Sequence, residues 1–334
     1  MSITQNMPKN GKLHDSRKGH GIDIVRERLK GQYPFFILVG LFVIASLTSD
    51  AFLTRDNLTN LISQLAVTGV LVLGELVVVI SGGIDISVGS VLGLTSVVSA
   101  GVFGGVNVWV GLLVALGAGA VLGAVNGGLI AFRGVEAFIV TLGMLALARG
   151  LVYAYTEGSP ITPKDPNFSI PGTASVLGFP TIAFFWATAC LLMAFLLRRT
   201  VFGRRVYAIG SSKMAAQSSG LPVRSTIFLV FVLAGLLAGL AGFMLTSRVG
   251  AGTPSAGLSY ELDAIAAVVI GGARLNGGYG KVSGAVIGTF IFGIITNLLV
   301  LLNVSTFLQD AFKGALILVA VGVAAGRNSG AAKR

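Results

Sequence analysis

Four polar or charged side chains interrupt long apolar stretches of this sequence: Glu75, Asn126, Arg149 and Asn297. Such a group is costly in an apolar segment, so each is a candidate for lining the path of a polar solute. Structural alternatives are open, because Glu75 and Arg149 lie about five or six residues from the ends of their segments and can extend to a polar boundary. We favour such snorkelling, or structural pairing, for both. Asp310 and Lys313 are spaced to pair on one helix face.

Two glycine-rich interruptions form a second set of candidates. The first is "GGIDISVGS", with Gly82, Gly83, Asp85 and Ser87, and the second is "GGARLNGGYGK", with Gly271, Gly272 and Asn276. Each is either a tight turn, with Asp85 or Ser87 capping the helix that follows, or a broken segment that lines a gate or pathway. The stretches around them are weakly similar, which leaves an internal repeat open.

A third stretch, "GRRVYAIGSSKMAAQSSGLPV" at Gly203–Val223, is polar and basic. Ser211 or Ser212 can cap a short helix of about two turns, which Gly220 and Pro222 then stop. Such a helix is suited to docking in a groove of a partner protein. The spacing alone favours an ordinary basic loop.

The sequence lacks the pattern of a nucleotide-hydrolysing enzyme. "GYGK" before Val282 resembles part of a phosphate-binding loop, but that loop requires Gly where Leu275 stands, and Ser or Thr in place of Val282. We therefore expect no catalytic residue, no metal site and no cofactor in this chain.

The elements that position these residues are predicted to be membrane-spanning helices. Charged residues make up only 11% of the 334 residues, and the mean hydropathy is +0.87. A helix needs roughly 20 apolar residues to cross a bilayer, so the chain is predicted to be an all-α polytopic bundle of about ten helices. The predicted spans are 34–48, 57–80, 88–103, 108–132, 137–155, 181–197, 226–245, 262–270, 282–300 and 307–325.

Charge predicts the orientation of these spans. If successive spans cross the membrane in opposite directions, the loops and tails on the side of the termini carry nineteen Lys and Arg residues, and the loops on the other side carry three. Because basic residues gather in cytoplasmic loops, both termini are predicted to be cytoplasmic. Eight spans with two embedded hairpins would place the termini identically. The net charge of +11 has this topological cause, so we exclude nucleic acid as a partner.

Glycines at helical spacing predict where the spans pack closely. Gly119, Gly123 and Gly127 share one helix face, as do Gly235 and Gly239. Gly284 and Gly288 form a third pair of this kind. Small residues let membrane helices approach each other, so we expect these faces to be helix–helix contacts.

Between Asn57 and Val323 the chain resembles a known family. The strings "GGIDISVGS", "EAFIVTLG", "YTEGSPI" and "YELDAIAAVVIGGARLNGGYGK" look like those of the membrane permease subunit of ribose-type ATP-binding-cassette importers. The resemblance implies a monosaccharide substrate such as ribose, ten spans and a location in the bacterial inner membrane. It also implies three kinds of partner: a cytoplasmic ATPase that uses the ATP, a periplasmic sugar-binding protein, and a second permease copy or paralogue.

The resemblance also changes the interpretation of the basic loop. It implies that residues 199–225 form a cytoplasmic coupling loop to the ATPase, with Gly210, Ser212, Lys213, Ala215, Ala216 and Gly220 as its site residues. The chain is then divided into a basic cytoplasmic tail (1–33), a transmembrane permease domain (34–326) with a periplasmic loop (156–180), and a second cytoplasmic tail (327–334). Lys213 and Met214 stand where the family commonly has an acidic residue, and Glu75 where an uncharged one is expected.

The alternative hypothesis is an ion-coupled secondary transporter that works alone. It would use Glu75 or Asp85 as its proton carrier, which requires a titratable group deep in a span.

Overall fold

The computed structural model of the chain describes residues 33–101 and 106–331. The predicted basic tail up to residue 32, the end of the predicted third span and the last three residues lie outside the described residues. The longer helices are α2 (Tyr33–Thr48), α3 (Arg55–Ile80), α4 (Val88–Ala100), α5 (Val108–Arg133), α6 (Ala137–Thr156), α8 (Thr181–Arg199), α9 (Val201–Ser211), α11 (Val223–Val249), α12 (Tyr260–Ile270), α13 (Val282–Leu301) and α14 (Thr306–Ala331).

The prediction of an all-α polytopic membrane protein is confirmed. Six of the described helices, namely α3, α5, α6, α8, α11 and α13, are long and apolar enough to cross a membrane. The apolar helices α2 and α4 are shorter. Most predicted span boundaries agree with the helix ends within a few residues.

Local capping explains where several of these helices begin and end. Thr54 precedes α3 and accepts a hydrogen bond from the Asn57 N–H at 3.4 Å, and Asn107 does the same for the Trp109 N–H at 2.9 Å at the start of α5. The α5 helix stops at Gly134, whose φ of 72° is a left-handed conformation that glycine adopts without a steric penalty.

Small elements fill the connections. Between α6 and α8 lie the 3₁₀ helix η2 (Pro166–Ser169), the single turn α7 (Ile170–Thr173) and an antiparallel pair of two-residue strands, β1 (Ser175–Val176) and β2 (Phe179–Pro180). The sequence predicts only a loop here, at 156–180. The short helix α10 (Lys213–Ser218) follows α9 in the basic loop.

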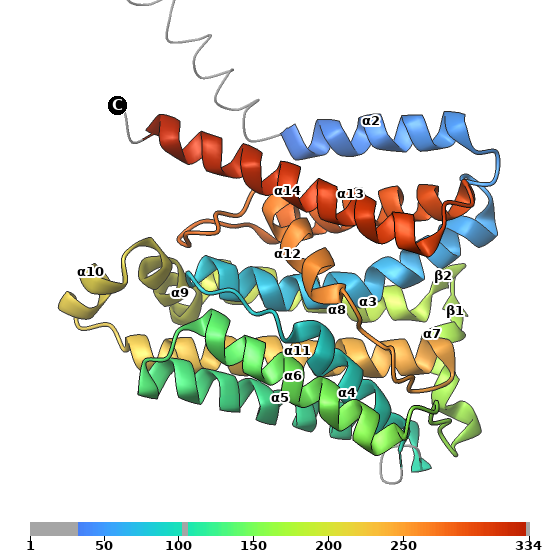
Figure 1. Cartoon of the computed structure of the whole chain (residues 1–334), viewed down its shortest axis with the longest axis horizontal. Helices are drawn as coiled ribbons and strands as arrows, with labels where there is room; N and C mark the ends of the chain where they lie inside the picture. The colour runs from blue at the N-terminus through green and yellow to red at the C-terminus, as the bar shows by residue number, and fades with distance from the viewer. Residues whose placement is uncertain (1–32, 102–105, 332–334) are drawn as a thin grey trace, which may run out of the picture.

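The helices lie side by side, with α3 and α11 inside the bundle (Figure 1). The apolar window of α3 is 83% buried and that of α11 is 67% buried, whereas the window of α5 is only 22% buried. At one end of the bundle lie α9 and α10, and the C-terminal end of α14 is at the same end (Figure 1). The N-terminal end of the α2 ribbon also faces that end (Figure 1).

The predicted glycine faces are confirmed as close helix contacts. A Cβ atom added at Gly119 would overlap the carbonyl oxygen of Gly235, and one at Gly235 would overlap that of Gly119. Gly123 lies in the same way against the Phe231 carbonyl, so α5 and α11 meet backbone to backbone. On the other side of the bundle, Gly288 of α13 is packed against the Ala267 carbonyl of α12, and Gly284 against Gly271, the residue that follows α12.

We expect Gly123→Ala to destabilise the folded protein by roughly 1–3 kcal/mol, because its methyl group would press on the backbone of α11. Gly128→Ala is the matched control on the same helix, since nothing lies within 4 Å of a Cβ there. Thermal unfolding of the purified protein in detergent measures both. Equal stability of the two variants would contradict the assigned contact.

Candidate functional site

Three segments that are distant in sequence meet at the C-terminal end of α3. The Gly278 N–H donates a hydrogen bond to the Ile80 carbonyl at 2.9 Å. Gly210, near the end of α9, is packed on the same carbonyl, and a Cβ there would also lie 2.6 Å from the Gly278 nitrogen. A Cβ at Gly277 would lie 2.9 Å from the Cα of Gly82. We call Ile80, Gly82, Gly210, Gly277 and Gly278 the glycine junction.

This junction unites two sets of residues that the sequence had singled out separately. Gly82 belongs to the first predicted gate segment, and Gly277 and Gly278 adjoin Asn276 of the second. Gly210 comes from the predicted coupling loop. Backbone atoms are in contact on all three sides, so α9 touches both predicted gate segments directly. The sequence offered no signal that Gly210 would be the third partner.

A tyrosine hydroxyl adds a second connection between α9 and the 271–281 segment. Tyr207 donates a hydrogen bond to the Gly280 carbonyl at 2.7 Å. Burial raises the pKa of the Tyr207 phenol, which keeps the hydroxyl protonated as this bond requires. In the same segment, the Arg274 guanidinium lies 5.2 Å from the centre of the Tyr279 ring, a cation–π contact.

The two gate segments begin with the same backbone turn. Gly82 follows the end of α3 with a φ of 88°, and Gly272 follows the end of α12 with a φ of 89°. The next N–H in each case returns to a carbonyl five residues earlier, at 3.1 Å for both Gly83 to Val78 and Ala273 to Val268. This is the Schellman pattern, in which the positive φ calls for glycine. Gly271, by contrast, packs against α13 at Gly284.

After Gly83 the chain folds back along α3 into the protein. The Asp85 N–H donates to Glu75 Oε1 at 3.3 Å, and Asp85 Oδ1 accepts from the N–H and hydroxyl of Ser87 at 2.8 and 2.6 Å. Asn126 of α5 donates to the Ser87 hydroxyl oxygen at 3.1 Å. The structure therefore joins Glu75, Asp85, Ser87 and Asn126 into one buried network across α3, α4 and α5.

This network excludes one of the two favoured alternatives for Glu75, snorkelling, and agrees with the other, a structural role. The side chain does not snorkel to the surface, because Glu75 is fully buried and bonded to Asp85. Two atoms of the network, Glu75 Oε2 and Asn126 Oδ1, are buried without a hydrogen-bond partner among the described residues. Ser87 precedes α4 as predicted, but its hydroxyl donates to Asp85 and does not cap the helix.

The short helices α4 and α12 meet at their N-termini. A Cβ at Gly89 would overlap the Gly257 carbonyl and Glu261 Oε2. Glu261 lies in the first turn of α12, so its carboxylate is placed where the partial positive charge of a helix N-terminus favours an anion. Sequence reasoning had not singled out Glu261, Gly89 or Gly257; the contact depends on the tertiary fold.

Arg149 of α6 binds the loop that leads into α12. Its guanidinium donates to the carbonyl oxygens of Pro254 at 3.2 Å and Ala256 at 2.8 Å. Of the two favoured alternatives for Arg149, snorkelling and structural pairing, these contacts support the structural one. Asn297 of α13 exchanges two hydrogen bonds with Asn57 of α3, at 2.8 and 3.1 Å. The sequence analysis had not singled out Asn57.

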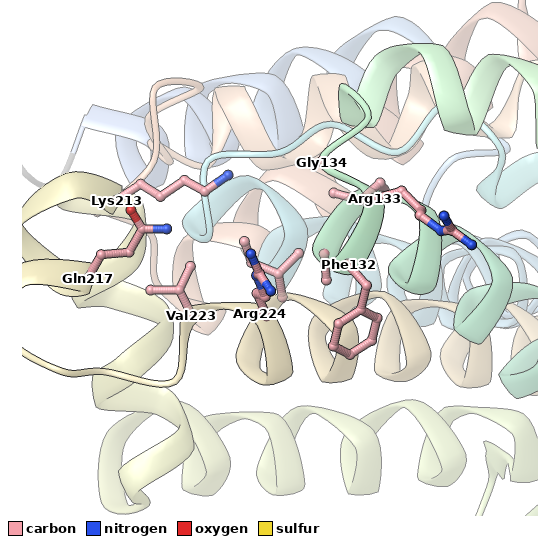
Figure 2. A pocket seen from close by; sticks show the side chains of 10 residues that line it. Phe132, Arg133, Gly134, Lys213, Gln217, Val223 and Arg224 are labelled. Carbon is pink, nitrogen blue, oxygen red and sulfur yellow. The ribbon is translucent and has the colours of Figure 1, made fainter.

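The predicted short helix in the basic loop is confirmed as α10. The Ser212 hydroxyl oxygen accepts from the Ala215 N–H at 3.2 Å, and Gly220 ends the segment with a φ of 72°. Lys213 and Gln217 lie on the same side of α10 (Figure 2). Ala215 is exposed, whereas Ala216 is only 4% exposed and packs inward. Ala216 is thus not a surface that a partner could contact.

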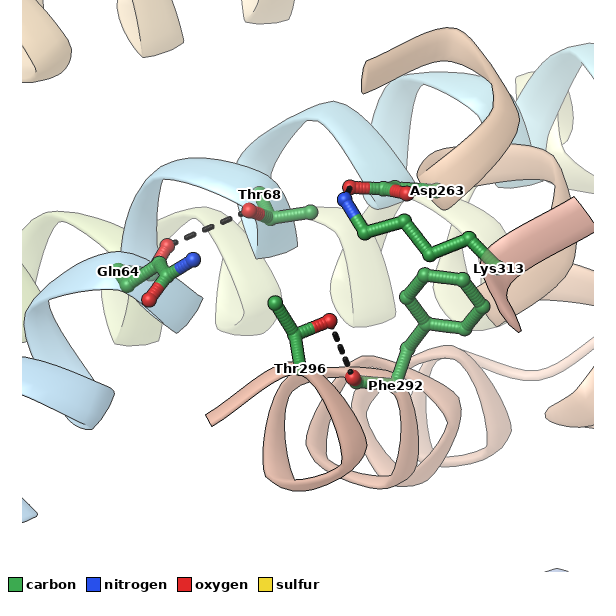
Figure 3. A network of polar contacts seen from close by, with 6 residues as sticks. All are labelled: Gln64, Thr68, Asp263, Phe292, Thr296 and Lys313. Carbon is green, nitrogen blue, oxygen red and sulfur yellow. Dashed lines mark hydrogen bonds and ion pairs between the residues drawn. The ribbon is translucent and has the colours of Figure 1, made fainter. Parts of the chain in front are cut away.

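One ion pair crosses between helices. Lys313 of α14 reaches Asp263 of α12, with Nζ and Oδ2 separated by 3.2 Å (Figure 3). The prediction that Lys313 pairs with Asp310 on its own helix is therefore wrong. Nearby, the Thr296 hydroxyl donates to the Phe292 carbonyl at 3.0 Å within α13 (Figure 3).

Comparison with known proteins places this arrangement in a family. The family model described as "Branched-chain amino acid transport system / permease component" matches residues 57–321. The chain belongs to this permease family. The match includes both gate segments, the glycine junction and α10.

Relatives in this permease family are similar to the chain over most of its length. The ribose import permease protein RbsC of Bacillus subtilis (strain 168) is 42% identical over 316 residues, which cover 94% of this chain and 97% of that protein. RbsC of Escherichia coli (strain K12) is 41% identical over 298 residues, covering 88% and 93%. The D-allose transport system permease protein AlsC of the same strain is 38% identical over 290 residues, covering 86% and 89%. No solved structure matches this chain.

Proposed function

We propose that this chain is the membrane permease subunit of an ATP-driven importer that carries a ribose-like monosaccharide across a bacterial inner membrane. The observation that carries the proposal is the identity of about 40% to ribose import permeases over nearly the full length of both chains. The xylose transport system permease protein XylH of Escherichia coli (strain K12) is also similar, at 36% identity, which supports a monosaccharide as the substrate class.

The proposed topology has ten spans with both termini in the cytoplasm. It is supported by the charge asymmetry of the loops and by the position of α9 and α10 at the same end of the bundle as the end of α14 (Figure 1). The matching Schellman turns after α3 and α12 support an internal repeat. On this topology, residues 1–33 and 327–334 are cytoplasmic tails, 34–326 is the permease domain and 156–180 is the periplasmic loop.

The proposed energy source is a separate cytoplasmic ATPase, which binds and hydrolyses the ATP. Its contact is the 199–225 loop, where the exposed side chains of Met214 and Ala215 are available on α10. A periplasmic sugar-binding protein delivers the substrate, and a second permease copy or paralogue completes the membrane unit. No cofactor, metal or catalytic residue of this chain takes part.

The glycine junction gives this proposal a mechanism. When the ATPase moves α10, α9 moves with it, because only Ser212 separates the two helices. Gly210 then transmits the movement to the backbone of both gate segments, which contact it directly. Because sugars are neutral and rich in hydroxyl groups, the path needs hydrogen-bonding groups and little charge.

The test is uptake of radiolabelled ribose into vesicles containing the chain, its ATPase and its binding protein. We expect uptake to require ATP and to persist when an uncoupler collapses the proton gradient at constant ATP. Glu75→Gln is expected to keep uptake within several-fold of the wild type, because the amide oxygen can still accept from the Asp85 N–H. An ion-coupled transporter would instead lose uptake with the uncoupler.

A further inference from the structure

A pocket of about 230 Å³ lies where two membrane-spanning helices end beside α10 (Figure 2). Its floor is the last turn of α5, its wall is the first turn of α11, and α10 contributes Lys213 and Gln217. We call it the interfacial pocket, because Arg133 is the last residue of α5 and Val223 is the first of α11.

The interfacial pocket is electropositive. Three of its ten lining residues are basic, namely Arg133, Lys213 and Arg224, and none is acidic. None of the three forms an ion pair with an acidic side chain among the described residues. Figure 2 shows Lys213 extending across the pocket and Arg224 standing between it and Phe132, while the Arg133 guanidinium points away from the other two. An anion in this pocket would thus meet two cations at once, those of Lys213 and Arg224.

The other side of the pocket is apolar. Phe132 is 53% exposed, and its ring lies 5.6 Å from that of Phe228 on α11. Ile130 and Ile227 also line the pocket. An apolar wall at the end of two spans, next to cations in the loop beyond, matches a molecule with an anionic head and a hydrocarbon tail. A free inorganic anion has no hydrocarbon part that could contact this apolar wall.

The geometry of α10 separates this pocket from the proposed ATPase contact. Lys213 and Gln217 are four residues apart on the helix, so they share the face that lines the pocket. Met214, which is 79% exposed, does not line the pocket and stands about 100° around the helix. The face with Met214 is therefore free for a protein partner while the other face is occupied.

We propose that the interfacial pocket binds the headgroup of an anionic phospholipid. Lys213 and Arg224 hold the phosphate group, and an acyl chain lies along Phe132. Basic pockets between membrane helices on the cytoplasmic side are suited to such headgroups. The bound lipid connects α10 to α5 and α11 and so helps to fix its position. This proposal does not depend on which solute the protein transports.

The test is native mass spectrometry of the full chain in detergent, titrated with dioleoyl-phosphatidylglycerol and, separately, with dioleoyl-phosphatidylcholine. The pocket variant is Lys213→Gln/Arg224→Gln. The matched control is Arg199→Gln/Arg204→Gln, which removes two exposed charges from the same region outside the pocket. We expect the pocket variant to bind phosphatidylglycerol about 30-fold more weakly, since each basic side chain contributes about fivefold.

The control variant is expected to bind phosphatidylglycerol like the wild type, and phosphatidylcholine is expected to bind weakly to all three proteins. Excess inorganic phosphate should not displace the lipid.

Three results would overturn the proposal. Equal losses of phosphatidylglycerol binding in the pocket and control variants would indicate a diffuse basic surface, and displacement of the lipid by phosphate would indicate a simple anion site. If the pocket variant bound phosphatidylglycerol as the wild type does but no longer bound the ATPase, the pocket would be a contact for the ATPase and the lipid proposal would be wrong. Should the double variant fail to purify, Lys213→Gln alone, at an exposed position, is expected to lose about fivefold.

Discussion

Gly210→Ala is expected to reduce ATP-driven sugar uptake at least about tenfold, the largest effect that we expect from adding a single methyl group. The methyl group would overlap the Ile80 carbonyl oxygen and lie 2.6 Å from the Gly278 nitrogen. Both are backbone atoms, which cannot rotate away as a flexible side chain can. The Ile80–Gly278 hydrogen bond would break, and α9 would separate from both gate segments.

The measurement is uptake per assembled transporter in vesicles, together with ATP hydrolysis by the same complex. We expect hydrolysis to continue while uptake fails, because α10 and its proposed ATPase contact lie beyond Gly210. Gly143→Ala is the matched control, since nothing lies within 4 Å of a Cβ there. Uptake by the Gly210 variant equal to that of the control would show that the glycine junction does not transmit the movement. Thermal stability of both variants separates this effect from unfolding.

The sequence was sufficient to predict most of the helices, because their signals are local. Apolar runs of membrane length define α3, α5 and α11, and Gly220, whose φ is positive, ends the α10 segment as expected. The capping of α10 by Ser212 is also a local interaction and was one of two predicted alternatives. Close packing at the glycine faces of α5 and α11 could be predicted because small residues let membrane helices approach each other. That these two faces meet each other is known only from the structure.

The sequence was not sufficient for contacts between distant segments. Lys313 and Asp310 have the spacing of a helix pair, yet Lys313 reaches Asp263 fifty residues away because α12 and α14 pack together. Glu75 was near enough to a helix end to suggest snorkelling, but the chain folds back after Gly83 and covers it. The contact of Gly82, Gly210 and Gly277 could not be predicted either, because a glycine has no side chain that would indicate its partner.

Lys313→Met is expected to destabilise the folded protein by about 3 kcal/mol. The change leaves the Asp263 carboxylate, which is 10% exposed, without its counter-ion. Its Oδ1 has no hydrogen-bond partner among the described residues, so Lys313 is the main group that offsets the cost of burying this charge. Removing one partner of a buried pair typically costs 3–5 kcal/mol. We expect the lower value, because Asp263 lies in the first turn of α12, where the helix dipole also favours an anion.

A second substitution tests whether the uncompensated charge is the cause. Asp263→Asn in the Lys313→Met background removes the charge that was left alone, so we expect the double variant to regain most of the lost stability. Lys164→Met, at an exposed position of the loop between α6 and α8, is the control for the loss of a lysine alone and is expected to change little. Thermal unfolding in detergent measures all three. If the double variant were as unstable as Lys313→Met, the lysine would act through the packing of its aliphatic chain between α12 and α14, and the ion pair would not be what holds these helices together.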